Sequence, residues 1–161
     1  MILERMACNR AIFLSFGASV ALFLAFRWVH AGVGDGPLLD TLLNGSTTRS
    51  RLAEMSAQEI NRHLIGTLTI DMLYPAAYGT LLAGLLFRLG GTWQTPLAIL
   101  PLVGALLDVM ENVVQAIALA GGPDLLDAKI ILTGPKFAFF VLSAGLIAIL
   151  ALFALVRHLA R

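Results

Sequence analysis

The sequence has few charged residues and a single cysteine, and both features exclude classes of protein. Charged residues make up 13% of the 161 residues, against roughly 25% in soluble globular domains. The formal net charge is +1, and no block of like charges occurs that would indicate a nucleic-acid partner. The single cysteine, Cys8, excludes an intramolecular disulfide. These features exclude a nucleic-acid-binding protein and a disulfide-stabilised secreted domain.

Long apolar segments are what the sequence has in abundance. Hydrophobic residues make up 58% of the chain, and the mean hydropathy is +0.86. Four segments are long enough for the roughly 20-residue helix that crosses a bilayer: residues 11–28, 64–87, 97–120 and 130–156. They lack the short alternating pattern of a membrane β-barrel. We therefore predict an all-α, polytopic membrane protein of one domain, in which four transmembrane helices form a bundle.

The first predicted span shares some features with a cleavable signal peptide. Arg5 and Arg10 precede its apolar run, and residues 29–31 resemble a signal-peptidase site. However, the run is long for a signal peptide, and Arg27 and Trp28 are typical of an interfacial anchor. We expect this span to be retained.

The connection between the first two spans is predicted to be partly helical. Residues 35–37, Asp-Gly-Pro, predict a helix start, residues 38–43 a short amphipathic helix, and residues 44–45, Asn-Gly, its end. Ser56 followed by Glu59 forms a capping box. A second helix is therefore predicted to begin directly after Ser56 and to continue into the second span.

Basic residues near the span ends are evenly divided between the two membrane sides. One side carries Arg5, Arg10, Arg88, Arg157 and Arg161. The other carries Arg27, Arg49, Arg51, Arg62 and Lys129. Three arginines of the second group lie in a longer connection that also holds acids, which favours the first side as cytoplasmic. We predict an integral protein of a bacterial inner membrane with both termini in the cytoplasm.

Polar side chains recur at helical spacing inside three of the predicted spans. An ionisable residue at the centre of a membrane helix costs roughly 2.5–3.5 kcal/mol on insertion scales, so it marks a functional site by default. Residues three and four apart share a helix face. The second span has His63, Thr67, Asp71, Tyr74 and Tyr78 on one face; the third has Asp108, Glu111, Asn112 and Gln115; the fourth has Lys136, Phe140 and Ser143.

The three polar faces are predicted to meet in one layer of the bundle. Because the spans alternate in direction, a rise of ~1.5 Å per residue places Asp71, Glu111 and Lys136 roughly 10–13 Å below the same membrane surface. Pro75 removes the hydrogen bond to the Asp71 carbonyl and bends the helix there. The freed carbonyl needs a donor, for which a tyrosine of the same face, water or a ligand is expected.

The residue types in this layer suit proton transfer. Three carboxyls facing one lysine in a low-dielectric site cannot all be ionised, so one retains a proton, as in general acid–base catalysis. The candidate catalytic residues are Asp71, Asp108 and Glu111. The candidate ligand contacts are Tyr74, Tyr78, Asn112, Gln115, Lys136 and His63. With no histidine near Asp108 or Glu111, we predict no metal site, and no cofactor is indicated.

Two short motifs resemble a known group of proteins. Residues 71–78, DMLYPAAY, and 108–112, DVMEN, are similar to the Asp-x-x-[Phe/Tyr]-Pro-x-x-Tyr and Asp-x-x-Glu-Asn motifs of small bacterial four-span membrane proteins of unsettled function. The resemblance extends from Arg62 to Phe140 and implies that the motif residues and Lys136 act as one unit. His63 stands where that group has an aromatic residue. A looser likeness, in architecture alone, is to emopamil-binding and sigma-2-receptor proteins, whose helices enclose a pocket with acidic residues.

The sequence leaves three functions open. The first is binding of a membrane lipid or lipid-like molecule in the polar pocket, with acid–base chemistry as a further role; Glu111→Gln should then abolish activity and spare the fold. The second is an accessory subunit of a larger membrane complex, in which the polar layer is an interhelical clamp. The small residues Gly17/Ala21 and Gly79/Ala83 offer contact faces for such a homo- or hetero-oligomer. The third is a proton-coupled transporter, which a four-helix chain without an inverted repeat favours least.

Overall fold

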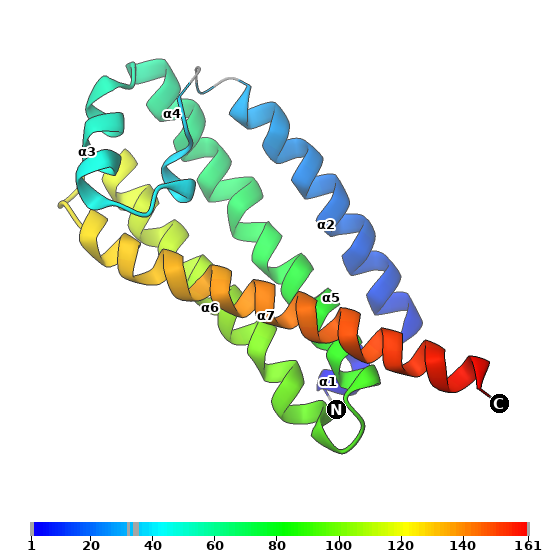
Figure 1. Ribbon diagram of the computed structural model, residues 1–161. Helices are drawn as coiled ribbons and strands as arrows, with labels where there is room; N and C mark the ends of the chain where they lie inside the picture. Colours follow the sequence, from blue (N-terminus) through cyan, green and yellow to red (C-terminus); the bar gives the residue numbers. More distant parts are fainter. Residues whose placement is uncertain (1, 32, 34–35, 161) are drawn as a thin grey trace.

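The computed structural model describes residues 2–31, 33 and 36–160, and the regular structure of these residues is helical throughout (Figure 1). The elements are α1 (Ile2–Met6), α2 (Asn9–His30), the 3-10 turn η1 (Leu39–Thr41), α3 (Gly45–Glu54), α4 (Ala57–Gly66), the π-helical turn η2 (Thr67–Asp71), α5 (Met72–Leu89), the 3-10 turn η3 (Gly91–Trp93), α6 (Gln94–Leu119) and α7 (Leu126–Leu159). The helix cap predicted at Asp35 lies outside the described residues.

Four stretches are long and apolar enough to cross a membrane: Asn9–Val29, Ala57–Leu89, Gly91–Leu119 and Leu126–Leu159. This confirms the predicted all-α fold with four spans. The second stretch joins α4, η2 and α5 end to end. The predicted capping box begins it, because the Ser56 N–H donates to Glu59 Oε2 at 2.8 Å and the Glu59 N–H donates to Ser56 Oγ at 3.3 Å.

Small residues allow α5, α6 and α7 to approach closely. A Cβ at Gly104 of α6 would lie 2.9 Å from the Cβ of Phe139 in α7. A Cβ at Gly79 of α5 would lie 2.9 Å from the Cβ of Ala105 in α6, and Ala83 is fully buried. The face predicted at Gly79/Ala83 is therefore used inside the bundle. In contrast, nothing lies within 4 Å of a Cβ built at Gly17 on α2.

Tight turns join the second span to the third and the third to the fourth. Gly91, between the second and third spans, has a φ of 55°, and Gly121, between the third and fourth, has a φ of 75°. Both lie in the left-handed region, which glycine adopts without steric cost. The turns make α5, α6 and α7 sequential neighbours, and the chain ends lie at the same end of the bundle (Figure 1).

The opposite end of the bundle is covered by residues 36–56, which we call the roof (Figure 1). The short α-helix predicted over residues 38–43 is only the turn η1. Asn44 begins α3 instead of ending a helix, since its Oδ1 accepts the N–H groups two and three residues further on. Burial decides the conformation of this segment, because the leucines around η1 enter an apolar core formed by Val29, Val33, Leu38, Leu39, Met55 and Leu119.

Ion pairs tie one edge of the roof to the start of α7. Arg49 lies 2.6 Å from Asp124 and 3.0 Å from Asp127. The hydrogen bond from Arg49 lowers the pKa of Asp124. Because these groups are exposed to solvent, the pairs position the roof more than they stabilise the fold.

Candidate functional site

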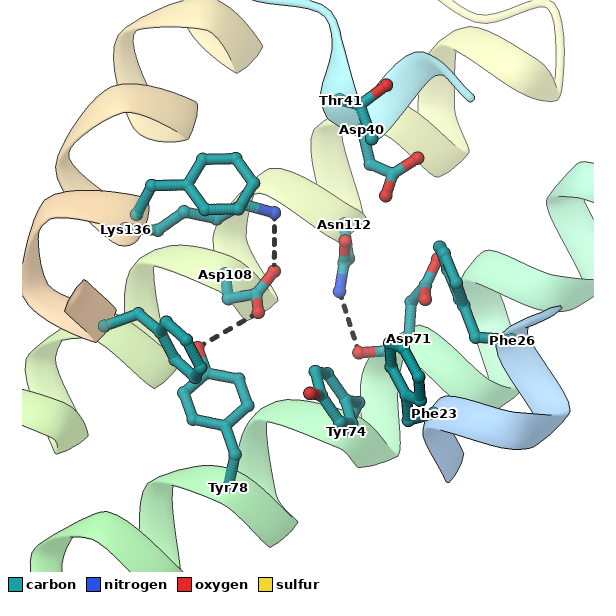
Figure 2. A pocket seen from close by; sticks show the side chains of 12 residues that line it. Phe23, Phe26, Asp40, Thr41, Asp71, Tyr74, Tyr78, Asp108, Asn112 and Lys136 are labelled. Carbon is teal, nitrogen blue, oxygen red and sulfur yellow. Dashed lines mark hydrogen bonds and ion pairs between the residues drawn. The ribbon is translucent and has the colours of Figure 1, made fainter. Parts of the chain in front are cut away.

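Two lysines of α7 and two acids of α6 form one buried network. Lys129 Nζ lies 3.2 Å from Glu111 Oε1, and Lys136 Nζ lies 2.6 Å from Glu111 Oε2. Lys136 Nζ also donates to Asp108 Oδ1 at 2.9 Å, and Tyr78 Oη donates to Asp108 Oδ2 at 3.0 Å (Figure 2). The Glu111 and Lys129 side chains are 0% exposed. Glu111 thus bridges two ammonium groups in the interior of the bundle.

The spacing of α7 aligns the groups that surround Glu111. Lys129, Thr133 and Lys136 are separated by steps of four and three, which place them on one helix face. Thr133 Oγ1 donates to Glu111 Oε1 at 2.8 Å. Lys129 Nζ additionally donates to two backbone carbonyls of the roof, those of Leu39 and Leu42. Lys129 therefore connects the roof to the ion-pair network.

The position of Lys129 corrects the sequence prediction, which placed it outside the membrane as an orientation charge. The physical reason is that α7 begins at Leu126 and the roof closes over its first turn. The burial of Lys129 could have been predicted from the helical spacing in the sequence. Lys129 and Thr133 extend the predicted face of Lys136 toward the N-terminus at the same spacing.

Asp71 lies at a break in the regular hydrogen bonding of the second span. Pro75 has no N–H, and the Asp71 carbonyl accepts instead from Asn112 Nδ2 at 2.8 Å (Figure 2). The donor is thus an amide of α6, and neither tyrosine of the same face donates to this carbonyl in the described part of the chain. The turn η2 directly precedes this point, and π-helical turns within α-helices frequently occur at functional sites.

A cavity of about 250 Å³ lies beside the network and is lined by all four spans and the roof. Six of its lining residues are site residues predicted from the sequence: Asp71, Tyr74, Tyr78, Asp108, Asn112 and Lys136. Six more were not predicted as site residues: Phe23, Phe26, Asp40, Thr41, Phe137 and Phe140. Lys136, whose place in the pocket the sequence left undecided, is 7% exposed and belongs to the cavity wall.

Three predicted site residues lie outside the cavity wall. Glu111 is enclosed by the ion-pair network. Gln115 is fully buried, and its Nε2 donates to Thr67 Oγ1 at 3.2 Å. His63 is 3% exposed, and its Nε2 lies 3.9 Å from Asp40 Oδ1. Ligand contacts by Gln115 and His63 stay predictions, since neither side chain lines the cavity.

Asp40 is the acid of the cavity wall that the sequence did not indicate as a site residue. It belongs to η1, and its side chain is 16% exposed. Burial raises the pKa of Asp40, and the positive charges of Lys136 and Lys129 oppose this shift. In the sequence Asp40 is one polar residue of a connection, because only the folding of the roof brings it over the cavity.

The site has more carboxyl groups than cations. Asp108 and Glu111 are paired with the two lysines. Within the described part of the chain, the carboxyls of Asp40 and Asp71 are neither hydrogen-bonded to another residue nor paired with a lysine or arginine. In a low-dielectric site these two groups require protons or a positively charged partner. Among the same residues, no group of three His, Cys, Asp or Glu side chains is arranged to hold a metal ion.

Comparisons of the chain with protein-family models, curated proteins and solved structures found no match. The fold and the site together define a four-span helical membrane protein with a buried carboxylate–lysine network.

Proposed function

We propose that the protein binds an amphiphilic, lipid-like molecule whose polar group enters the cavity. The observation that carries this proposal is a cavity with acids and a lysine on its wall together with six aromatic side chains, inside a membrane-spanning bundle. Its volume of about 250 Å³ equals roughly eight waters at ~30 Å³ each. That is room for a headgroup, so an apolar tail has to extend out of the cavity.

The arrangement of the spans supports a tail that extends into the lipid. Phe23 of α2 and Phe137 of α7 line the cavity and are 52% and 45% exposed. α2 packs against α5, whereas α7 packs against α5 and α6 (Figure 1). The exposed rings of α2 and α7 thus flank the cavity with apolar surface that faces the hydrocarbon.

Acid–base chemistry on the bound molecule is a further part of the proposal. Asp71 is the candidate for exchanging a proton, since its carboxyl lines the cavity and is free of a protein partner among the described residues. Asp108 also lines the cavity but is held by Lys136 and Tyr78. Glu111 acts through the two lysines, which it holds in place.

A substitution that blocks the cavity tests the binding proposal. Thr41 lies at the cavity rim, so Thr41→Trp should fill part of the space. Thr47, exposed on α3, provides the matched control Thr47→Trp. Native mass spectrometry of the protein purified in mild detergent should detect one amphiphile per chain in the wild type and in Thr47→Trp, and little in Thr41→Trp. Recovery of bulk phospholipid alone, equal in all three proteins, would contradict the proposal.

An accessory subunit of a larger membrane complex is the second candidate. It is favoured by the self-contained ion-pair network and by the small-residue face at Gly17 and Ala21 of α2, which is open in this chain. The other predicted face, at Gly79 and Ala83, is occupied inside the bundle. Affinity purification in mild detergent distinguishes the candidates, because a subunit should bring a stoichiometric partner. Proton-coupled transport is the third candidate and has no specific support.

The site also bears on the proposed orientation. With Lys129 buried in the ion-pair network, the basic residues near the span ends number five on the side of the termini and four on the other. This supports the predicted cytoplasmic position of both termini. The exposed Cys8 tests it: a membrane-impermeant maleimide should label Cys8 in inverted vesicles only. Ser46→Cys in a Cys8→Ser background, in the exposed roof, should label in intact cells.

A further inference from the structure

Around the cavity, most hydrogen-bond donors have a protein acceptor, whereas several acceptors have no donor from another residue. The polar donors of Thr41, Tyr78, Asn112 and Lys136 each already donate to a protein oxygen, whereas the Tyr74 hydroxyl on the same wall donates to none of the described residues. The acceptors are different: within the described part of the chain, no other residue donates to the carboxyl of Asp40 or Asp71. Asp40 Oδ1 is buried without a hydrogen-bond partner, and the contact to this carboxyl is from the backbone of Asp40 itself. Asn112 is 2% exposed, and no donor to its Oδ1 occurs in that part of the chain either.

The unused acceptors surround one space. Figure 2 shows the Asp40 side chain, from the roof, directed toward the Asp71 carboxylate, from η2, with Asn112 beside them, and all three residues line the cavity. A buried acceptor without a donor is costly, and an unpaired buried carboxylate more so. A bound molecule that supplies both N–H groups and positive charge would satisfy all three residues.

We infer that the amphiphile carries a protonated primary amine, and that Asp40, Asp71 and Asn112 accept its N–H groups. This inference rests on the proposed binding function and narrows it to one headgroup chemistry. The aromatic rings of Phe23, Phe26 and Tyr74 on the same wall add favourable contact with a cation.

Other headgroups fit the wall less well. An anionic group would have to compete for Lys136, whose charge is already matched by Asp108 and Glu111, and would lie near two further carboxylates. A neutral alcohol can donate one hydrogen bond but brings no charge. A quaternary ammonium brings the charge without an N–H donor. The wall therefore selects the primary amine over both.

Chain-matched probes test this selection. The purified full chain in a nonionic detergent is titrated with dodecylamine, dodecyltrimethylammonium and dodecanol at neutral pH, and binding is measured by thermal stabilisation and by native mass spectrometry. Dodecylamine should bind once per chain and at least about tenfold more tightly than the other two. Asp40→Asn and Asp71→Asn should each weaken its binding about tenfold or more, because each removes a charged partner. Glu54→Gln, at an exposed acid of α3, should leave binding unchanged.

The outcomes separate this inference from the proposed function. Equal binding of dodecanol and dodecylamine, or unchanged dodecylamine binding in both Asp→Asn variants, would refute the amine while leaving amphiphile binding intact. No binding of any probe and no co-purifying amphiphile would refute both. If Asp71→Asn does not fold, Asp40→Asn in the roof decides the question. Displacement of dodecylamine by phosphatidylethanolamine, and not by phosphatidylcholine, would identify a lipid headgroup as the source; displacement by neither would identify a free long-chain amine.

Discussion

Replacement of Glu111 by glutamine is expected to destabilise the bundle strongly. The carboxylate is shared by Lys129 at 3.2 Å and Lys136 at 2.6 Å, and both lysine side chains are at least nine-tenths buried. An amide keeps the shape but carries no charge. The sequence alone predicts that this change spares the fold, because it shows one lysine near three acids and does not show that Glu111 has two cationic partners.

The magnitude follows from what each lysine retains. Lys136 keeps its 2.9 Å contact with Asp108. Lys129 loses its carboxylate and, among the described residues, is left with the carbonyls of Leu39 and Leu42 as acceptors. Removing one partner of a buried ion pair costs about 3–5 kcal/mol. For a chain of this size each kcal/mol lowers Tm by roughly 2–4 °C, so a decrease on the order of 10 °C is expected.

Thermal unfolding in a nonionic detergent, followed by circular dichroism, measures this effect. Glu54→Gln is the control, since that side chain is exposed on α3. The double variant Glu111→Gln, Lys129→Met should recover part of the loss, because it also removes the uncompensated charge of Lys129. A Tm of Glu111→Gln within about 2 °C of the wild type would refute the reasoning. Strictly additive losses in the double variant would do the same.

Three further predictions test the packing, the roof and the start of the second span. Gly104→Val should lower stability by about 1–3 kcal/mol, because its Cβ would lie 2.9 Å from that of Phe139, whereas Gly17→Val should be nearly neutral by the same thermal unfolding assay. Because burial raises the pKa of Asp40 above its usual 3.8, the folded state binds an extra proton and stability should fall as pH rises through this shifted pKa. Asp40→Asn should flatten that profile and raise Tm at neutral pH; an unchanged profile would contradict the assignment. Ser56→Ala should cost about 1 kcal/mol, measured as a lower Tm, since it removes the cap bond to the Glu59 N–H.

The spans, the turns and the capping box are determined by local sequence. A run of about 20 apolar residues meets the length requirement of the bilayer wherever it occurs. Ser56 and Glu59 are three residues apart and cap their own helix, and Gly91 and Gly121 adopt conformations that few other residues tolerate. None of these features needs information from a distant part of the chain.

The sequence also determines which helix faces carry the polar residues of the buried layer. Helical periodicity and the alternation of span direction place Asp108, Asn112 and Lys136 in one layer of the bundle, and the structure brings all three to one cavity. Periodicity does not give the partner of each group. The donor to the Asp71 carbonyl is Asn112, which lies 41 residues further along the chain.

Only the tertiary structure decided which charges are buried and which acceptors stay free. From the sequence, Lys129 is predicted to be a surface charge. In the folded protein it is buried under the roof, where it contacts the carbonyl of Leu39, 90 residues earlier in the chain. Likewise, Asp40 is predicted from the sequence to be one polar residue of a connection. In the folded protein the roof, to which it belongs, places it at the cavity. The physical reason is that the cost of burying a charge depends on what surrounds it, and the surroundings of both residues come from segments that are neighbours only in the folded bundle.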